Sequence, residues 1–528
     1  MNKRVLVADR IAPSGIEFLK QQDGFIVETH AGLAEAELCE RIAACHALIV
    51  RSGTRVTARA IDAADSLQVI GRAGIGVDSI DVERATERGI AVLNTPDANA
   101  TTTAELTLAH ILSLSRNLPQ ADRSVRAGEW KRSHFVGAEL ANKLLGIVGY
   151  GTIGRIVAAR AKALQMQVAA HDPFVTEEVF AADAVEAMHL DELVASADYL
   201  TLHCPLNDKT RGIISSARIR SMRPGARLIN CARGGLVDEK ALYDALKSDQ
   251  LGGAALDVFE NEPPGDSPLL HLDNVVFTPH LGASTREAQD AAGREIARQI
   301  AVYLQSGEPI NAINLPPVSA EEMIKLRPYL TLARRLGRLL GCMIQEPVRQ
   351  LDVVLSGDAS ARDARSVSIE GLAGLLSTHM SAPINRVNAM HLARQQGISL
   401  MESRCAEHPD YHTAVSLCAH HGDRTTAVEG TLFDRRHPRL VRINNYEIEA
   451  VLDGHMLLTR HRDQPGVIAA VSTLLAANKI NISRMQLGII NGSEHAVAVL
   501  AISSPVDEAL LRAIADVPAV SKVAQVSL

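Results

Sequence analysis

The chain has 528 residues, which at ~150 residues per domain predicts three or four domains. Hydrophobic residues make up 47% and charged residues 22%, both near the averages of globular proteins, so extensive disorder and fibrous repeats are excluded. The net charge is -7 and only 3% of residues are aromatic. Neither a basic phosphate-binding face nor a base-stacking surface is indicated, so nucleic acid is not an expected partner.

No apolar run reaches the ~18 residues that a membrane-spanning helix needs, and the N-terminus leads directly into a strand at residues 5–8. Seven cysteines are scattered along the chain without a Cys-x-x-Cys pair. We therefore expect reduced thiols, a cytoplasmic location and no membrane partner.

Short apolar strand patterns alternate with helical patterns from residue 5 to about residue 317. In the middle of this stretch the predicted strands are residues 144–148, 167–170, 198–203, 227–230, 253–256 and 275–278. This alternation is typical of an open, mostly parallel α/β sheet.

A double proline, Pro316-Pro317, separates this region from a basic helix predicted over residues 329–343. An α+β module follows, with a hairpin of residues 411–417 and 425–432 joined through residues 421–423. The last stretch reads strand 456–461, helix 465–477, strand 481–487, strand 495–502, helix 505–515 and strand 522–526. That order is the βαββαβ pattern of a ferredoxin-like domain.

A glycine-rich motif, with Gly149, Gly151 and Gly154, follows the strand at residues 144–148 and opens a helix. In a dinucleotide-binding turn these glycines permit the tight turn, the approach of a pyrophosphate and close helix packing. The next strand ends at Asp172, near the ~20-residue spacing of a ribose-binding acid. The alternative is that Asp172 only caps its strand. No Arg or Lys occurs in residues 173–180, so we expect NAD rather than NADP.

Side chains that could take part in catalysis follow the predicted strands at residues 227–230, 253–256 and 275–278. In doubly wound sheets these ends lie on one rim, where ligands bind. His280 could exchange a hydroxyl proton, Arg233 could hold a carboxylate as a bidentate fork, and Glu262 could stabilise the imidazolium of the histidine. Each also has a plainer interpretation: a loop histidine, a surface arginine and a solvated acid.

Four runs identify a family: residues 149–154, 230–238, 256–263 and 278–285. They resemble the NAD-dependent D-2-hydroxyacid dehydrogenases, in which a Rossmann-type nucleotide domain is inserted in a flavodoxin-like substrate domain. Residues 51–54, 71–78, 94–96 with Asn99, and 130–132 are similar to those of the members that oxidise 3-phospho-D-glycerate, the first step of phosphorylated L-serine biosynthesis. The resemblance implies a substrate domain of residues 1–98 and 282–316, a nucleotide domain of 99–281, an α+β intervening domain of 317–453 and a ferredoxin-like ACT domain of 454–528.

The resemblance also implies roles for individual residues. The catalytic residues would be Arg233, Glu262 and His280. The NAD contacts would be Gly149, Gly151, Thr152, Ile153, Gly154, Asp172, Cys204, Cys231, Ala232, Asp257, Ile75, Gly282 and Ala283. The substrate contacts would be Arg51, Arg72, Gly74, Asn99 and Arg132, with the arginines directed at the phosphate. At position 75 some relatives carry a threonine, so Ile75 keeps the packing but lacks the hydroxyl.

Regulation and assembly are implied in the same way. ACT domains bind small amino acids between paired subunits, and His461, Asp463 and Asn481 match the effector positions, so L-serine is the expected inhibitor. Alternatively, Pro465-Gly466 merely starts a helix and Asn481 caps a turn. Trp130 lies in a segment that relatives use between nucleotide domains, so the resemblance implies a homo-oligomer, namely a homotetramer; alternatively, Trp130 fills its own core.

Two further residue clusters are not expected to form binding sites. Cys405, His408, His412, Cys418, His420 and His421 do not match the spacing of a known metal site, so no metal is expected. Arg334, Arg335 and Arg338 are most simply a solvated helix face. The competing functions are a dehydrogenase of another acid, such as glycerate, glyoxylate, lactate or 2-oxoglutarate, and a non-catalytic NAD-sensing scaffold.

Overall fold

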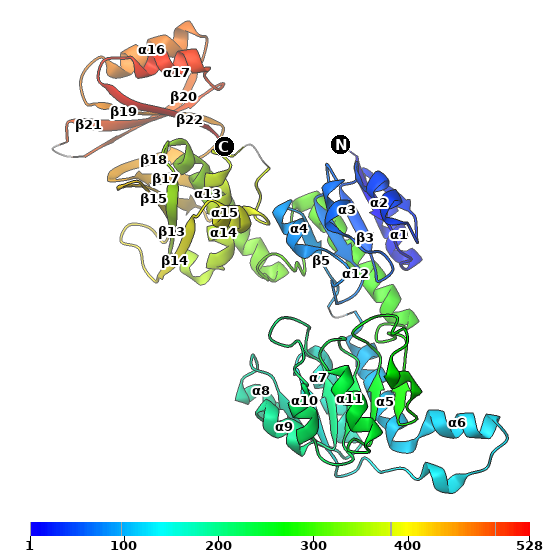
Figure 1. Cartoon of the computed structure of the whole chain (residues 1–528). Helices are drawn as coiled ribbons and strands as arrows, with labels where there is room; N and C mark the ends of the chain where they lie inside the picture. Colours follow the sequence, from blue (N-terminus) through cyan, green and yellow to red (C-terminus); the bar gives the residue numbers. More distant parts are fainter. Residues whose placement is uncertain (1, 97, 381–382, 491–492) are drawn as a thin grey trace.

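The computed structural model describes residues 2–96, 98–380, 383–490 and 493–528. Four β-sheets follow one another along the chain, each with its own helices (Figure 1). In the described residues no helix combines the length and apolar character needed to cross a membrane. The α/β class predicted from the alternating pattern is confirmed.

The first sheet is parallel, with the order β2-β1-β3-β4-β5. Its strands are β1 (Lys3–Val7), β2 (Phe25–Thr29), β3 (Ala47–Val50), β4 (Val69–Arg72) and β5 (Ala91–Leu93). Its helices are α1 (Pro13–Lys20), α2 (Glu35–Ile42), α3 (Ala58–Asp62), α4 (Val82–Glu87) and, from far along the chain, α12 (Arg286–Ser306). A Cβ on Gly71 would lie 2.7 Å from Ile296 of α12, so this glycine lets the late helix pack directly on β4.

The second sheet is also parallel, with the order β12-β11-β10-β9-β6-β7-β8. Its strands are β6 (Leu144–Val148), β7 (Gln167–His171), β8 (Glu186–Ala187), β9 (Tyr199–Leu202), β10 (Arg227–Asn230), β11 (Gly253–Leu256) and β12 (Val275–Phe277). Its helices are α5 (Ala100–Arg116), α7 (Thr152–Ala163), α8 (Glu177–Ala182), α9 (Leu190–Ser196), α10 (Ser216–Ser221) and α11 (Glu239–Lys247), with the 3-10 turn η2 (Pro268–His271). All six predicted strands are present. Strand β8 was not predicted, because its two exposed residues carry no apolar pattern.

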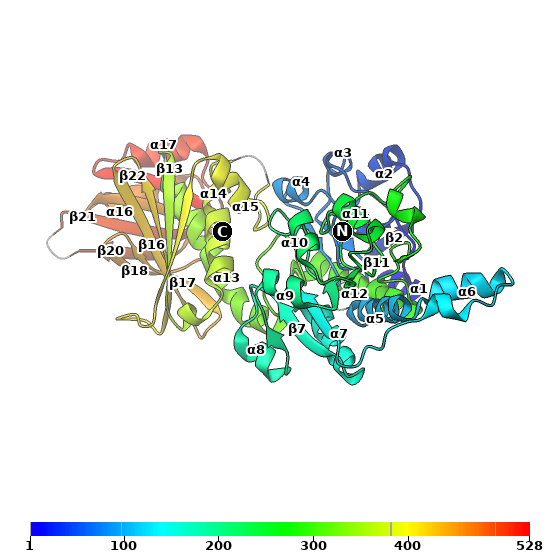
Figure 2. The ribbon, with the colours of Figure 1, turned by 60° about the horizontal axis from the view of Figure 1, so that its bottom comes forward.

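An arm extends from this second unit (Figure 2). It consists of α6 (Leu118–Arg126) and the 3-10 turn η1 (Arg132–Phe135). Trp130 of the arm is 74% exposed, so the interpretation that Trp130 fills its own core is wrong. Leu118, Val125 and Val136, at either end of the arm and within it, are also exposed. The arm therefore presents apolar side chains to its surroundings.

The third sheet is mixed, with the order β14-β13-β15-β16-β17-β18. Its strands are β13 (Val348–Gly357), β14 (Ser399–Cys405), β15 (Thr413–His421), β16 (Arg424–Phe433), β17 (His437–Ile443) and β18 (Tyr446–Val451). Its helices are α13 (Ala320–Cys342), α14 (Ala364–Leu376) and α15 (Ala389–Gln395), with the 3-10 turn η3 (Asp358–Ala361). The predicted hairpin is confirmed as β15 and β16.

The start predicted for the helix of this third unit is wrong. We placed it at Tyr329, where the basic helical pattern was taken to begin, yet α13 begins at Ala320 and passes through Pro328. Met323 and Leu326, which precede the proline, are buried in the apolar core of this unit. Tertiary packing thus outweighs the lost backbone hydrogen bond.

The last sheet is antiparallel, with the order β20-β21-β19-β22. Its elements are β19 (His455–Arg462), α16 (Val467–Ala477), β20 (Ile482–Ile489), β21 (His495–Ile502), α17 (Glu508–Ala515) and β22 (Val520–Ser527), which confirms the βαββαβ order. Both helices cover one face of the sheet (Figure 1). From the other face Leu458 and Val499 join the core of the third unit, so the two C-terminal units share an apolar interface.

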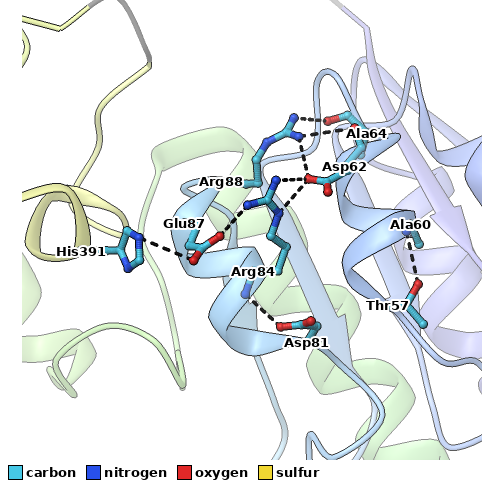
Figure 3. A network of polar contacts seen from close by, with 9 residues as sticks. All are labelled: Thr57, Ala60, Asp62, Ala64, Asp81, Arg84, Glu87, Arg88 and His391. Atoms are coloured by element: carbon cyan, nitrogen blue, oxygen red, sulfur yellow. Dashed lines mark hydrogen bonds and ion pairs between the residues drawn. The ribbon is translucent and has the colours of Figure 1, made fainter. Parts of the chain in front are cut away.

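The third unit also touches the first, through α15 and α4 (Figure 3). His391 Nε2 lies 3.6 Å from Glu87 Oε1, and Glu87 pairs with Arg84, which in turn binds Asp62. The side-chain amide of Asn385 donates to the carbonyl of Gly89 at 2.7 Å. These contacts tie the C-terminal units to the five-stranded sheet, at the surface of α4.

Candidate active site

A cleft of about 390 Å³ lies where loops after strands of the first two sheets meet. Its lining combines the imidazole of His280, the guanidinium groups of Arg72 and Arg233, and the backbone of the glycine-rich loop after β4. A second cleft of about 410 Å³ adjoins it, since Asn99 and Ala283 line both, and Arg51 lines the second. The structure thus gathers residues that are far apart in sequence into one polar hollow.

His280 and Glu262 form the hydrogen-bonded pair expected from the sequence. His280 Nδ1 lies 2.7 Å from Glu262 Oε2, and the backbone N–H of Phe259 donates to Glu262 Oε1 at 3.2 Å. Burial raises the pKa of Glu262, but the hydrogen bond and the charge of His280 outweigh it and hold that pKa below its usual value. The ring is held through Nδ1, so Nε2 is the atom available to a substrate.

The loop that carries His280 is shaped by Asp257, which is 1% exposed. Asp257 accepts hydrogen bonds from Thr278 Oγ1 at 2.5 Å, from the N–H of Leu281 at 2.7 Å and from the N–H of Gly282 at 2.9 Å. His280 itself has a φ of 55°, an uncommon conformation for a residue with a side chain. Asp257 thereby fixes the loop conformation that presents the imidazole.

Two residues of this network escaped the sequence analysis. Thr278 Oγ1 lies 3.1 Å from His110 Nε2 of α5, and burial lowers the pKa of His110. The threonine could have been noticed as the residue two positions before His280. The histidine gave no signal, because it lies in an apolar helix far away in sequence.

A second histidine lines the cleft, but it is poorly suited to proton transfer. Burial lowers the pKa of His203 to about 3, and its Nε2 lies 3.0 Å from Thr201 Oγ1. Because the pKa of His203 is far below neutral and its Nε2 is engaged by Thr201, His203 is a poorer general base than His280.

Arg233 reaches into the cleft from the loop after β10. Its Nε donates to Asp78 Oδ2 at 2.9 Å, and its Nη1 donates to the carbonyl of Ala232 at 2.7 Å. A Cβ on Gly76 would lie 1.7 Å from Arg233 Nη2, so the glycine makes room for the guanidinium. Asp78 was part of the motif that suggested the family, but it was given no role of its own.

Two more of the predicted substrate arginines lie near this centre. Burial, followed by the charge of Arg233, lowers the pKa of Arg72 to about 10, and its Nη1 occupies the space beside Gly74, where a Cβ would lie 1.8 Å away. Asp9 accepts a hydrogen bond from the backbone N–H of Arg51 at 2.5 Å. Asn99 is 8% exposed.

Arg132 is not brought to either cleft within one chain. It lies on the arm, with its guanidinium carbon 5.8 Å from the ring centroid of Trp130. Its predicted contact with a substrate phosphate would therefore require an arrangement that a single chain does not show.

The glycine motif forms a cradle at the N-terminus of α7. Gly149 has a φ of 95°, which favours glycine. A Cβ on Gly154 would lie 2.3 Å from the carbonyl oxygen of Gly149, whereas a Cβ on Gly151 would meet nothing within 4 Å. The backbone is thus closely packed at Gly154, where the helix meets the strand, and open at Gly151, where a pyrophosphate would approach. Thr152 and Ile153 begin the helix. The cradle fits a dinucleotide.

Asp172 ends β7 beside this cradle. Its Oδ2 accepts a hydrogen bond from the N–H of Tyr150 at 2.8 Å, and its Oδ1 accepts one from the N–H of Phe174 at 2.9 Å. The carboxylate therefore does cap the turn, and each oxygen keeps a second lone pair for a ribose hydroxyl.

The remaining predicted cofactor residues lie along the cleft wall: Ile75, Cys204, Cys231, Ala232, Gly282 and Ala283. Burial raises the pKa of Cys204 to about 11 and that of Cys231 to about 12. Both thiols are therefore protonated near neutral pH and act as apolar lining rather than nucleophiles.

The predicted effector residues are separated within one copy of the last domain. Asp463 follows β19 and its N–H donates to Glu494, before β21, whereas Asn481 accepts from Ser503, after β21. At ~3.3 Å per residue the length of β21 places them roughly 25–30 Å apart. His461 is 2% exposed beside Asp463. One chain therefore cannot close a small-molecule site from all three residues.

Three family models match this chain in succession. Residues 108–282 match the NAD binding domain of D-isomer specific 2-hydroxyacid dehydrogenase, residues 325–444 match the D-3-phosphoglycerate dehydrogenase intervening domain, and residues 455–519 match the ACT domain.

Curated relatives are similar over nearly the whole length. A D-3-phosphoglycerate dehydrogenase of Methanocaldococcus jannaschii is 41% identical over 99% of this chain and 100% of its own. One of Bacillus subtilis is 38% identical over 99% of both chains. Among solved structures, the TT0316 protein of Thermus thermophilus matches 59% of this chain and 99% of its own with a TM-score of 0.55 at 36% identity. A D-lactate dehydrogenase of Aquifex aeolicus, complexed with NAD and lactic acid, matches 57% of this chain and 96% of its own with a TM-score of 0.52 at 26% identity.

Proposed function

This chain belongs to the D-3-phosphoglycerate dehydrogenases, within the D-isomer specific 2-hydroxyacid dehydrogenase family, and from this premise we propose how its cleft works. The enzyme oxidises 3-phospho-D-glycerate to 3-phosphohydroxypyruvate with NAD, in the biosynthesis of L-serine. The observation that carries the catalytic assignment is the His280–Glu262 pair at 2.7 Å in the same cleft as Arg233.

In the proposed reaction His280 Nε2 removes the proton of the C2 hydroxyl. Glu262 stabilises the imidazolium that results, because the carboxylate is already hydrogen-bonded to Nδ1. Arg233 holds the substrate carboxylate and polarises the C2 oxygen as it becomes a carbonyl. Bound NAD supplies the hydride acceptor, the C4 atom of the nicotinamide.

We propose that the glycine cradle, Asp172 and the apolar cleft wall hold the cofactor. Asp172 would bind the ribose hydroxyls and repel a 2′-phosphate. The adjoining clefts suit the two ends of the substrate, with Arg233 at the carboxylate and Arg72 and Arg51 toward the phosphate.

Substrate choice is tested with initial rates on 3-phospho-D-glycerate and D-glycerate at saturating NAD. The wild-type enzyme should prefer the phosphorylated acid, and Arg72→Ala should lower its kcat/KM by roughly 10–100-fold, the effect of one lost charge-assisted contact, while changing the rate on glycerate little. Equal kcat/KM for the two acids in the wild type would favour a dehydrogenase of another 2-hydroxy acid.

The alternative of a non-catalytic NAD-sensing scaffold is tested separately. Replacing His280 with alanine should reduce turnover by roughly 10²–10⁴-fold, the contribution of a positioned proton-transfer group. If turnover were unchanged, His280 would have no role in the reaction.

We propose that the protein is a homo-oligomer in the cytoplasm, and that it is a homotetramer like the family it resembles. One observation supports assembly: the arm exposes Trp130 together with Leu118, Val125 and Val136. The domain limits that we propose are residues 1–98 with 282–316, 99–281, 317–453 and 454–528.

Inhibition by L-serine is the proposed control, at a site that His461 and Asp463 of one copy and Asn481 of another would form. A carboxylate would hold the ammonium group of serine and an amide its carboxylate. Serine must bind one domain arrangement better than another, and a coupling of about 1–3 kcal/mol would change affinity roughly 5–150-fold. Inhibition curves for the native chain and for Asp463→Ala test this, and equal curves would refute the site.

A further inference from the structure

Arg233 is held by a residue from the opposite wall of the cleft. Asp78 lies in the loop after β4, in the five-stranded sheet, whereas Arg233 lies in the loop after β10, in the seven-stranded sheet. Among the described residues, no other ion pair joins residues 2–96 to residues 144–277. The position of the arginine therefore depends on both walls.

The hydrogen bonds of the guanidinium define its orientation. Nε donates to Asp78 Oδ2 at 2.9 Å and Nη1 donates to the carbonyl of Ala232 at 2.7 Å. With two edges of a planar group held, rotation about the last side-chain bonds is blocked. Nη2 and the second hydrogen of Nη1 then form the fork that remains for a substrate carboxylate.

The loop is built to bring the two side chains together. A Cβ on Gly76 would lie 1.7 Å from Arg233 Nη2 and 2.8 Å from Asp78 Oδ2. Only glycine leaves the space in which the carboxylate and the guanidinium meet. The arginine side chain is 25% exposed and the aspartate 65%, so the pair contributes little to stability and its consequence is geometric.

We propose that Asp78 is a positioning residue, which holds Arg233 by Nε so that the outer edge of its guanidinium faces the substrate carboxylate. This rests on the function proposed for Arg233. The alternative is that Asp78 is merely a counterion. A carboxylate in this cleft repels an anionic substrate, so removal of a mere counterion should strengthen substrate binding. Removal of a positioning residue should instead weaken catalysis, and the two hypotheses predict opposite signs.

The test compares Asp78→Ala and Asp78→Asn with a control, Asp62→Asn. Asp62 is an exposed acid at the end of α3, in the same unit as Asp78; it pairs with Arg84 (Figure 3) and lines neither cleft. At saturating NAD, Asp78→Ala should lower kcat/KM for 3-phospho-D-glycerate roughly 10–100-fold, the effect of a lost charge-assisted hydrogen bond. Asp78→Asn, which keeps an acceptor without the charge, should fall between Asp78→Ala and the wild type. KM for NAD should not change, and the control should match the wild type.

A double-mutant cycle with Arg233→Lys isolates the pair. Lysine has no Nε–H at the guanidinium position, so Asp78→Ala should have little further effect in that background. The proposal would be overturned if kcat/KM were unchanged or raised in Asp78→Ala. It would also be overturned if Asp78→Ala lowered kcat/KM as much in the Arg233→Lys background as in the wild type. Either result would leave the role of Arg233 intact. If Arg233→Lys alone had wild-type activity, the proposed function of Arg233 would fail, and this inference with it.

Discussion

Replacing Glu262 with glutamine should separate the charge of this residue from its hydrogen bond. The hydrogen bond and the charge of His280 hold the pKa of Glu262 below its usual value, so the carboxylate is ionised at neutral pH and its negative charge faces the ring on which the imidazolium forms during the reaction. Glutamine can still bind Nδ1 but offers no charge. In the direction of alcohol oxidation the imidazole must begin neutral, so the loss of activity at low pH reports its protonation. The acidic limb of the pH profile of kcat/KM should therefore move to lower pH in Glu262→Gln.

The size of this movement can be estimated from the geometry. Nδ1 and Oε2 are 2.7 Å apart, and the side chains of His280 and Glu262 are 47% and 38% exposed. Unit charges about 4 Å apart interact by ~1 kcal/mol in water and ~4 kcal/mol at an effective dielectric constant of 20. Because both groups are well exposed, solvent screening favours the lower values, about 1–2 kcal/mol, or about one pH unit. The imidazolium is also less stable in the transition state, so the maximal kcat should fall by roughly tenfold.

The measurement is the initial rate of NADH formation over a pH series at saturating NAD. Glu260→Gln is the matched control, since Glu260 is an exposed acid of the same loop with no contact to His280. Its pH profile should coincide with that of the wild type. A limb that stayed in place in Glu262→Gln, or moved to higher pH, would show that the pair does not govern the base.

Other substitutions test the remaining parts of the site. Gly76→Ala should lower kcat/KM at least about tenfold at an unchanged melting temperature, because the Cβ displaces the flexible end of Arg233 rather than backbone. Asp257→Asn should lower both kcat and the free energy of unfolding, the latter by about 1–3 kcal/mol for each buried N–H left without an acceptor. Denaturant titration measures the stability, and wild-type stability would contradict the hydrogen-bond network around Asp257. Asp172→Ala should raise KM for NAD roughly tenfold and reduce the preference of the enzyme for NAD over NADP. Unchanged kinetics with both cofactors would show that Asp172 does not contact the cofactor. Trp130→Glu should reduce the mass measured by light scattering at micromolar concentration, whereas an unchanged assembly would exclude the arm from the contact.

Local patterns in the sequence were sufficient for most of the fold. Buried parallel strands are continuous apolar runs, so the six strands from β6 to β12 other than β8 were predicted directly, as was the βαββαβ order of the last domain. The motifs around Gly149, Arg233 and His280 were equally local, because each chemistry-bearing side chain directly follows a strand.

Tertiary structure decided whatever depends on contacts between distant segments. The run of α13 through Pro328 is stabilised by apolar side chains that pack far from it in sequence. The bond from Asp78 to Arg233 crosses between two sheets, and His110 reaches Thr278 from a helix whose own pattern is apolar. A sequence pattern reports which face of an element is buried, but not which side chains of other elements meet there. The orientation of Arg233, and with it the shape of the substrate site, was therefore determined only when both sheets were in place.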